Sequence, residues 1–232
     1  MEKKVALIHT SLVLINRDRL LLETFAEILP EVELVHIVDD GMLREVINSG
    51  EISPQITRRM CYYVMAAEAM AVDAIFNTCS SLGPAFDVAR LLVSTPTVKI
   101  DDGMAQKAVE VGQKIAVLAT VPSTLSPTIA LIKEKAAAIN KTIEIKEILC
   151  KGAFELLMQG EGERHDELVS QAAQEVAKWA DTIVLAQASM TRLAARLSDE
   201  TALPVLSSPR LGVQHLKNVL TNQDKSQGLY HE

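Results

Sequence analysis

Two similar halves of about 110 residues make up the chain, and this duplication restricts its fold more than any other feature of the sequence. Four pairs of segments match in the same order, at offsets of 110, 111, 108 and 108 residues. The pairs are 4–10 with 114–120, 32–41 with 143–152, 72–82 with 180–190, and Pro96 with Pro204. A chain of 232 residues can hold one large domain or two compact ones. The repeat predicts two lobes of similar structure.

Each half alternates short aliphatic runs with longer segments of helical periodicity. The expected strands are 4–9, 33–38, 73–77 and 97–100, followed by 114–119, 143–148, 181–186 and 204–206. These runs are almost continuously apolar, which is typical of parallel strands covered on both faces. The order strand, helix, strand therefore indicates an α/β fold with a helix-flanked parallel sheet in each lobe.

Helical periodicity separates these strands. We expect helices at 17–29, from Ser53 onward, at 128–138 and at 166–179. Ser53 is a typical N-cap, and the proline that follows it is a typical first helical residue. The last residues, 221–232, are polar and predict a loose tail.

Composition excludes several classes of protein. Hydrophobic residues make up 48% and charged residues 23%, a mixture typical of folded globular proteins rather than disordered chains. The net charge is −7 and no short window concentrates basic residues, so we expect no nucleic-acid partner. No apolar run reaches the ~18 residues of a membrane span, so we expect no membrane association. The three cysteines lack paired spacing, which indicates free thiols and a cytoplasmic location.

Several common motifs are missing from the sequence. There is no GxGxxG, no P-loop and no GxSxG nucleophile elbow. The five histidines, at 9, 36, 165, 215 and 231, show no metal-binding spacing. We therefore expect neither a cofactor nor a metal.

The candidate site lies where strands end, because ligands of open parallel sheets bind beyond the carboxyl ends of their strands. Four predicted strands run into polar segments there. The candidate substrate-binding residues are His9, Thr10, Ser11, Ser80, Ser81, Thr120, Ser123, Thr124, Gln187, Ala188 and Ser189, and the candidate catalytic residue is Cys79. Hydroxyls and backbone N–H groups at helix starts can hold a carboxylate, so a small anionic ligand suits an acidic protein.

Each of these residues also has a purely structural interpretation. Thr124 and Ser189 read individually as helix caps, since Ser and Thr after strands often cap helices. His9 is as consistent with a hydrogen-bonded core histidine as with an acid or base. Cys79 is different, because it lies at a strand-to-helix turn between Thr78 and Ser80, where a helix N-terminus lowers a thiol pKa. The other two cysteines, Cys61 and Cys150, are interpreted as structural.

Two segments resemble the motifs of a known enzyme family. Residues 73–81, Asp-Ala-Ile-Phe-Asn-Thr-Cys-Ser-Ser, resemble the first cysteine motif of the aspartate/glutamate/hydantoin racemase superfamily. Residues 181–190 resemble its second motif, and the openings Leu7-Ile8-His9-Thr10 and Leu118-Ala119-Thr120 are similar to the first strand of each family lobe. The resemblance spans nearly the whole chain.

The resemblance implies two α/β lobes related by a pseudo-twofold axis, with a small carboxylic acid bound in a cleft between them. It places the C-terminal residues back in the first lobe, giving 1–96 with 208–232 as the first lobe and 97–207 as the second. It further implies a cofactor-independent reaction, in which one cysteine removes the proton α to a carboxylate and another returns a proton on the opposite face. Homo-oligomers are common among such relatives.

The chain departs from the family at the second cysteine position, which holds Gln187. A carboxamide forms hydrogen bonds but neither takes nor gives a proton near neutral pH. Three hypotheses follow: an isomerase or racemase-like enzyme that uses Cys79, a decarboxylase in which Cys79 protonates an enediolate, and a non-catalytic module that binds small acids. The sequence does not specify the substrate.

Overall fold

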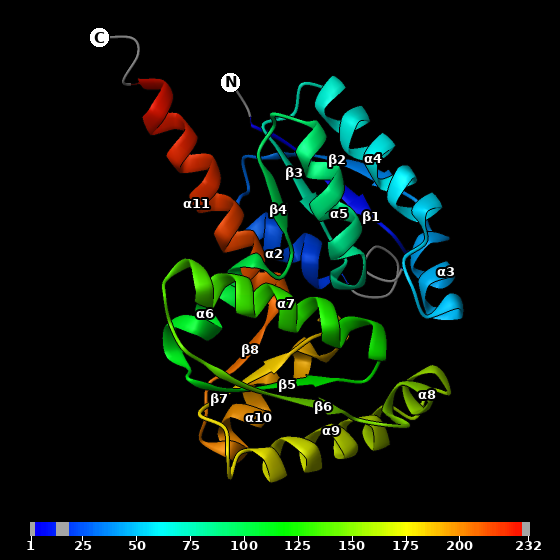
Figure 1. Ribbon diagram of the computed structural model, residues 1–232, viewed down its shortest axis with the longest axis vertical. Helices are drawn as coiled ribbons and strands as arrows, with labels where there is room; N and C mark the ends of the chain where they lie inside the picture. Colours follow the sequence, from blue (N-terminus) through cyan, green and yellow to red (C-terminus); the bar gives the residue numbers. More distant parts are fainter. Residues whose placement is uncertain (1–2, 13–18, 229–232) are drawn as a thin grey trace. The chain divides into compact units, whose positions relative to one another are not determined.

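The computed structural model describes residues 3–12 and 19–228 and divides the chain into two lobes. The first lobe consists of Met1–Ile100 and Pro209–Glu232, and the second of Asp101–Ser208. Each lobe contains a four-stranded parallel sheet, and the strand orders β2-β1-β3-β4 and β6-β5-β7-β8 are equivalent (Figure 1). The α/β class with a parallel sheet in each lobe is thereby confirmed.

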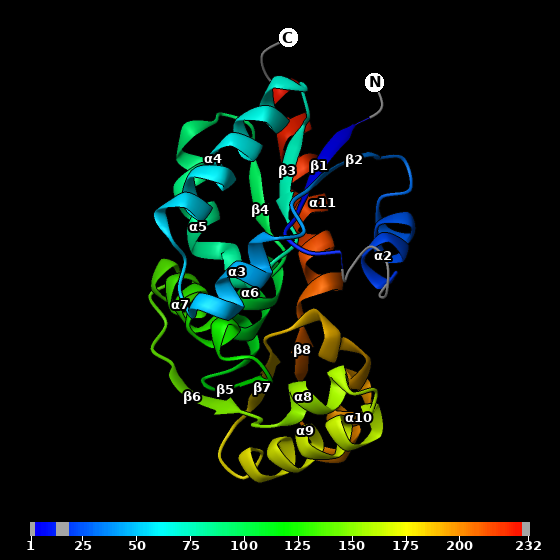
Figure 2. The ribbon, with the colours of Figure 1, turned by 90° about the vertical axis from the view of Figure 1, so that its right-hand side faces the viewer.

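The first sheet lies between two layers of helices (Figure 2). Its strands are β1 (Lys4–His9), β2 (Glu33–Val38), β3 (Ala74–Asn77) and β4 (Thr97–Lys99). The helices are α2 (Leu20–Ile28), α3 (Met42–Ser49), α4 (Pro54–Ala69), η1 (Ser80–Leu82), α5 (Gly83–Ala89), η2 (Arg90–Leu92) and α11 (Ser208–Gly228). One face of the sheet packs on α2 and α11, and the other on α3, α4 and α5.

The second sheet is covered in the same way. Its strands are β5 (Lys114–Ala119), β6 (Glu144–Leu149), β7 (Thr182–Leu185) and β8 (Val205–Ser207). Its helices are α6 (Asp102–Val111), α7 (Pro122–Ala138), α8 (Ala153–Met158), α9 (Gly162–Val176), η3 (Ala188–Leu193) and α10 (Ala194–Thr201). Helices α8, α9 and α10 pack on one face, where they share a buried aliphatic cluster with β5 and β7.

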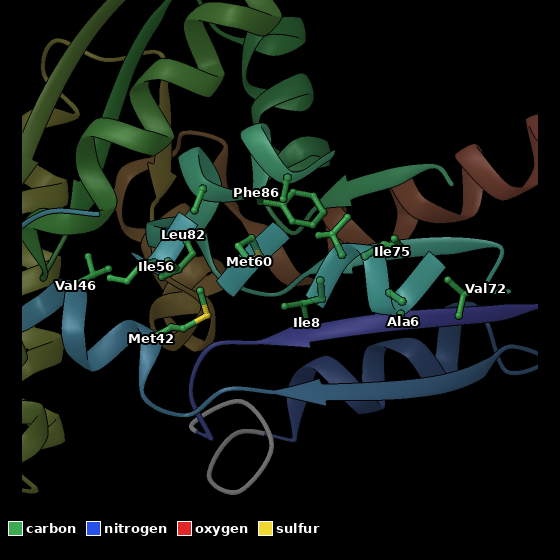
Figure 3. Packing of buried hydrophobic residues seen from close by; sticks show 14 residues of the cluster. Ala6, Ile8, Met42, Val46, Ile56, Met60, Val72, Ile75, Leu82 and Phe86 are labelled. Carbon is green, nitrogen blue, oxygen red and sulfur yellow. The ribbon is translucent and has the colours of Figure 1, made fainter. Parts of the chain in front are cut away.

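Aliphatic side chains of alternate strand positions fill the core on each face of the first sheet. Ala6, Ile8 and Ile75 belong to one buried cluster with Met60 of α4 and Phe86 of α5 on one side (Figure 3). Their neighbours along the strands point to the opposite face, toward α2 and α11. Successive side chains of a strand alternate between faces, so the nearly continuous apolar runs serve both layers.

In both lobes, an aspartate carboxylate accepts a backbone hydrogen bond at the amino end of a central strand. Asp73 Oδ2 accepts a hydrogen bond from Lys4 N at 2.7 Å, and Asp181 Oδ2 accepts one from Lys114 N at 3.0 Å. Gln113 N, in the turn before β5, donates a further backbone hydrogen bond to Asp181. The aspartate that opens each motif is therefore a structural residue at the edge opposite the candidate site.

The lobe boundary needs one correction. Strand β4 pairs with β3, through the register Ile75↔Thr97, and so completes the first sheet. The first lobe therefore extends to Ile100, four residues beyond the boundary that we placed after residue 96.

The predicted loose tail is wrong for residues 221–228, which continue helix α11; residues 229–232 lie outside the described part. Val213, Leu216 and Leu220 bury one side of this helix against the first sheet. Lys217 Nζ also donates a hydrogen bond to Ile28 O at 3.0 Å. The polar residues that suggested a tail occupy a helix that is anchored by its earlier turns.

The helix predictions hold in part. Ser53 caps α4, because its Oγ accepts a hydrogen bond from Ile56 N at 3.2 Å. The first predicted helix is present as α2, although residues 17–18 lie outside the described part. Helix α7 begins at Pro122 rather than at residue 128, since proline is well suited to a first helical turn. Helix α9 likewise begins at Gly162, four residues before the predicted start.

The close packing of α11 predicts an unusual response to mutation. A Cβ atom on Gly212 would lie 2.2 Å from the carbonyl oxygen of Ile100. We expect Gly212→Ala to lower the free energy of unfolding by about 1–3 kcal/mol, as overpacking does, although alanine normally favours helices. Chemical denaturation measures the change. Gly162→Ala in α9, where nothing lies within 4 Å, is the control and should be neutral or stabilising; equal effects at both positions would contradict the prediction.

Candidate functional site

Cys79 lies in a turn that is fixed by hydrogen bonds of the two preceding side chains, Asn77 and Thr78. It follows β3, precedes η1 and is partly buried. The Asn77 side chain brackets it, because Oδ1 accepts a hydrogen bond from Cys79 N at 3.2 Å and Nδ2 donates one to Cys79 O at 3.0 Å. Thr78 donates to Ile8 O at 3.0 Å through its hydroxyl. The thiol is thus presented at the carboxyl end of the sheet on a fixed backbone.

His9 is a buried residue with both ring nitrogens engaged. Its side chain is 1% exposed at the end of β1. Its Nε2 lies 3.0 Å from Nδ1 of His36, and its Nδ1 lies 3.4 Å from Oγ1 of Thr78. Burial, and secondarily the neighbouring His36, lower the pKa of His9 to about 4. His9 is therefore a neutral, hydrogen-bonded core histidine, and it has no free nitrogen for a substrate.

The other first-lobe candidates lie at the ends of β1 and β3. Thr10 is 1% exposed, and among the described residues its Oγ1 has no hydrogen-bond partner. Ser11 is half-buried after β1. Ser80 and Ser81 begin η1 directly after Cys79, and Ser81 is buried. The fold therefore brings the thiol and the hydroxyls to one edge of this sheet.

In the second lobe, Gln187 fastens the turn that follows β5. Its Oε1 accepts hydrogen bonds from Thr120 N at 2.5 Å, Thr120 Oγ1 at 3.0 Å and Val121 N at 3.1 Å. Three donors on one atom fix the amide so that its Nε2 group points away from them. Within residues 3–12 and 19–228, this Nε2 has no hydrogen-bond partner. The carboxamide therefore offers two N–H donors in a set orientation.

The remaining second-lobe candidates are not helix caps. Thr124 lies inside α7, and its hydroxyl donates to Val121 O at 2.8 Å. Ser189 lies inside η3 beside Ala188, and Gln187 occupies the N-cap position without a side-chain capping bond. The capping interpretation of these two residues is wrong because both helices begin before them. Ser123 is half-buried in the first turn of α7.

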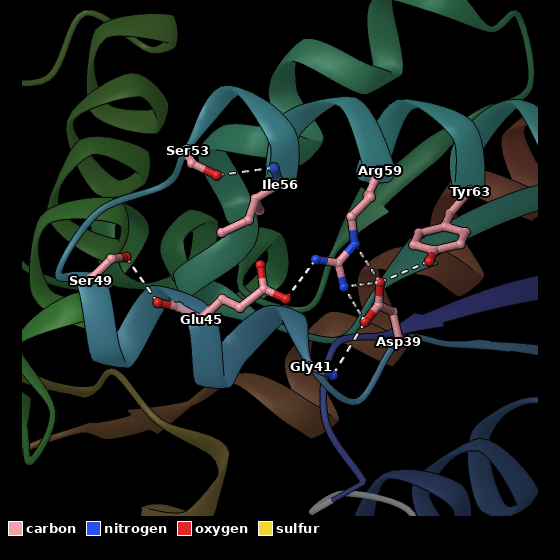
Figure 4. A network of polar contacts seen from close by, with 8 residues as sticks. All are labelled: Asp39, Gly41, Glu45, Ser49, Ser53, Ile56, Arg59 and Tyr63. Atoms are coloured by element: carbon pink, nitrogen blue, oxygen red, sulfur yellow. Dashed lines mark hydrogen bonds and ion pairs between the residues drawn. The ribbon is translucent and has the colours of Figure 1, made fainter.

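A charged network at the end of β2 was missed by sequence reasoning. Asp39 accepts hydrogen bonds from Arg59 at 2.5 Å and from the Tyr63 hydroxyl at 2.8 Å (Figure 4). Arg59 also pairs with Glu45 at 2.7 Å. Burial opposes ionisation of Asp39, but the hydrogen bonds from Arg59 and Tyr63 outweigh it and hold its pKa below the usual value. Arg59 is thus committed to two carboxylates of the chain itself.

A buried lysine was missed as well. Lys99 lies opposite Asn77 in the register of β4 with β3 and is 5% exposed. Its Nζ lies 2.9 Å from both carboxylate oxygens of Asp87. Its place as the last residue of a strand was the available signal, yet only pairing with β3 shows that it lies near the Cys79 turn.

The two other thiols have different surroundings. Cys61 is partly buried within α4. Cys150 follows β6 and is 6% exposed, and burial raises its pKa to about 11. A protonated buried thiol is unreactive, which agrees with a structural role for Cys150.

Two features are absent from the described part of the chain. Within residues 3–12 and 19–228, no three side chains of His, Cys, Asp or Glu are grouped so as to hold a metal ion. None of the helices in the described ranges combines the length and the apolar character needed to cross a membrane.

Comparison with known families identifies the lineage of this fold. The family model described as Asp/Glu/Hydantoin racemase matches residues 19–216. The chain belongs to this family. The recognition from the two motifs is thereby confirmed, although no curated protein sequence matches this racemase-family protein significantly.

Solved structures of racemases share the fold at low sequence identity. Glutamate racemase isoform RacE1 from Bacillus anthracis is 13% identical with a TM-score of 0.70, over 95% of this chain and 82% of that one. An aspartate racemase homologue from Pyrococcus horikoshii is 15% identical with a TM-score of 0.69, over 95% and 100%. Allantoin racemase from Klebsiella pneumoniae is 17% identical with a TM-score of 0.64, over 95% and 89%.

The Asp39 network predicts a pH-dependent loss of stability. Arg59→Met leaves the 10%-exposed Asp39 side chain without its cation, so we expect a loss of about 1–3 kcal/mol at pH 7. The folded-state pKa of Asp39 is depressed, so its contribution is present above the unfolded pKa of about 3.9 and is lost as pH falls through the folded pKa. Denaturation curves of wild type and variant should converge below about pH 4.

Arg58→Met is the control for this experiment, because Arg58 is an exposed neighbour on the same helix. Loss of the Arg58 charge should change the free energy of unfolding little, both at pH 7 and below about pH 4. A gap between Arg59→Met and wild type that does not narrow at low pH would count against the assigned role of Asp39.

Proposed function

We propose that the chain is a cofactor-independent isomerase of the racemase type that acts on a small carboxylic acid, an amino acid or a related compound. The observation that supports this most directly is the fixed, partly buried Cys79 at the carboxyl edge of a sheet, in a member of the Asp/Glu/hydantoin racemase family. Parallel α/β sheets bind ligands at this edge.

In the proposed reaction, the Cys79 thiolate removes the proton α to the substrate carboxylate. The C–H electron pair moves into the carboxylate and gives an enediolate, while the sulfur becomes a thiol. A partner acid on the opposite face then delivers a proton to the same carbon and gives the inverted product. The Cys79 thiol passes its own proton to solvent, which regenerates the thiolate, and the partner is reprotonated from solvent. No electrons leave the system, so the step needs neither an oxidant nor a cofactor.

Gln187 has a different task from Cys79 in this proposal. Its Oε1 is occupied by the Thr120–Val121 turn, so its Nε2 group is the part that remains for a ligand. We assign to this Nε2 a hydrogen bond to a carboxylate oxygen of the substrate, where fixed N–H donors stabilise the negative charge that develops in an enediolate. Thr10, Ser11, Ser80, Ser81, Thr120, Ser123 and Ser189 complete the proposed binding residues.

A lyase reaction is the second candidate, and the chemistry of Gln187 favours it. Loss of carbon dioxide from a substrate forms the enediolate without a base, so one thiol is enough to protonate it. Inversion by proton transfer, in contrast, needs an acid on each face. A binding module without catalysis is the third possibility and is an outcome of the tests below.

The first test removes the thiol. We expect Cys79→Ala and Cys79→Ser to reduce turnover of a small carboxylic acid by at least 10²-fold, the usual contribution of a positioned acid–base group. Cys61→Ala is the control, because it removes a thiol of similar exposure that lies on α4. Full activity in Cys79→Ala would refute the assigned mechanism.

The reaction type is tested in deuterated water with D- and L-glutamate, D- and L-aspartate, and monosubstituted malonates as substrates. Exchange of the α-hydrogen with inversion and no gas supports the isomerase. Stoichiometric release of carbon dioxide supports the lyase. Tight binding without change of any compound supports the module and overturns the proposed catalysis.

The role of Gln187 is tested by the isosteric change Gln187→Glu. A carboxylate oxygen keeps the three accepted hydrogen bonds, but its second oxygen replaces the two donors by a negatively charged acceptor. We expect unchanged thermal stability and at least tenfold weaker binding of the anionic substrate by calorimetry, because a donor is replaced by a repelling charge. Gln171→Glu, on the exposed side of α9, carries the same change of charge as a control. Equal affinities of wild type and Gln187→Glu would exclude the assigned contact.

A further inference from the structure

Three polar side chains beside Cys79 have no role in the proposed proton transfer. His36 on β2 is exposed, His9 on β1 is buried, and Thr78 directly precedes the thiol in sequence. They form a continuous chain, with 3.0 Å between His36 Nδ1 and His9 Nε2 and 3.4 Å between His9 Nδ1 and Thr78 Oγ1. The two imidazole rings stack with centroids 5.2 Å apart. The chain therefore runs from the surface to the Cys79 turn.

The hydrogen bonds assign the protons along this chain. The Thr78 hydroxyl donates to Ile8 O, so it accepts from His9 and the His9 proton is on Nδ1. His9 Nε2 is then an acceptor, and His36 Nδ1 donates to it. Both rings are neutral in this arrangement, in agreement with the pKa values of His9 and His36, which burial lowers.

The duplicated second lobe lacks this chain. The bond from Thr78 N to Ile8 O corresponds to the bond from Ala186 N to Leu118 O, so alanine stands where the first lobe has Thr78. In the same alignment, Ala119 ends β5 where His9 ends β1.

Two further positions differ in the same way. His36 lies opposite Leu7 in the first sheet, whereas Glu147 lies opposite Val117 in the second. Asn77, which brackets Cys79, corresponds to Leu185. The strand ends nevertheless adopt the same pairing, so the fold does not require the polar chain. The polar residues occur in the lobe that carries the thiol.

We propose that His36, His9 and Thr78 are positioning residues, which hold the Cys79 turn in place through hydrogen bonds rather than binding the substrate. The inference rests on the proposed function, in which Cys79 is the reacting thiol. His36 sets the tautomer of His9, His9 donates to Thr78, and Thr78 ties the turn to Ile8 O. Asn77 fixes the same turn through the backbone of Cys79.

The test distinguishes the contribution of His9 Nδ1 from that of His9 Nε2. Asparagine places an N–H donor near the position of Nδ1, whereas glutamine places its polar group near Nε2, so His9→Asn keeps the bond to Thr78 and His9→Gln loses it. Thr78→Val removes the acceptor at nearly constant volume. His36→Ala frees His9 to adopt either tautomer. Thr128→Val is the control, because Thr128 is equally buried and its Oγ1 has no partner within the described residues.

The first readout needs no substrate. Hydrogen–deuterium exchange of the Thr78, Cys79 and Leu82 amides, which bond Ile8 O, Asn77 Oδ1 and Cys79 O, reports on the turn. We expect exchange at least threefold faster in His9→Gln and Thr78→Val, a smaller increase in His36→Ala, and no increase in Thr128→Val. The double variant of His9→Gln and Thr78→Val should match the single variants, since both remove one bond. In His9→Asn, the amide exchange rates should return most of the way to the wild-type values.

The second readout is turnover in the exchange assay. We expect His9→Gln and Thr78→Val to lower kcat at least tenfold at unchanged KM, with recovery in His9→Asn. A raised KM at unchanged kcat would show that His9 binds substrate, and equal losses in His9→Asn and His9→Gln would show that its bulk matters rather than its donor; either result overturns the proposal. Unchanged amide exchange in folded His9→Gln also overturns it. Absence of turnover in the wild type contradicts the proposed function alone, and amide exchange then decides on the positioning chain.

Discussion

Parallel pairing of four strands brings all their carboxyl ends to one edge of each sheet, and the placement of every candidate residue depends on it. In the first lobe, segments that are far apart in sequence meet there: His9 after β1, Asp39 after β2, Cys79 after β3 and Lys99 at the end of β4. The opposite edge is fastened by Asp73 in the first lobe and by Asp181 in the second. The two edges thus differ: aspartate carboxylates bond the backbone at one, and the candidate site residues lie at the other.

The two lobes share this framework and differ in what they place on it. The first lobe carries a thiol with polar side chains on both sides of its turn. The second carries a carboxamide whose oxygen is bound by the neighbouring turn. The two lobes therefore present different chemical groups on equivalent frameworks, a thiol in the first and an amide N–H donor in the second.

The sequence predicts the strands of this protein well because buried parallel strands are nearly continuous aliphatic runs. Cys79 is also identifiable from sequence, since it follows such a run and precedes a helical segment. The extent of α11 cannot be predicted from the sequence, because its last turns are polar. They depend on the packing of Val213 and Leu216 against the first sheet. Contacts such as His9 with His36, or Gln187 with Thr120, depend on strand register and side-chain direction, which neither periodicity nor composition contains.

The three bonds to the Oε1 of Gln187 have a consequence for the backbone donors of the Thr120–Val121 turn. Backbone N–H groups at the start of a helix can bind an anionic oxygen, and here, just before α7, the Gln187 side chain supplies the oxygen. The Gln187 side-chain oxygen thus takes the position at which the oxygen of an anion could bind these donors. A shorter side chain at position 187 would leave the donors of Thr120 and Val121 without this oxygen. Carboxylate, phosphate or sulfate ions from solution could then bind to them.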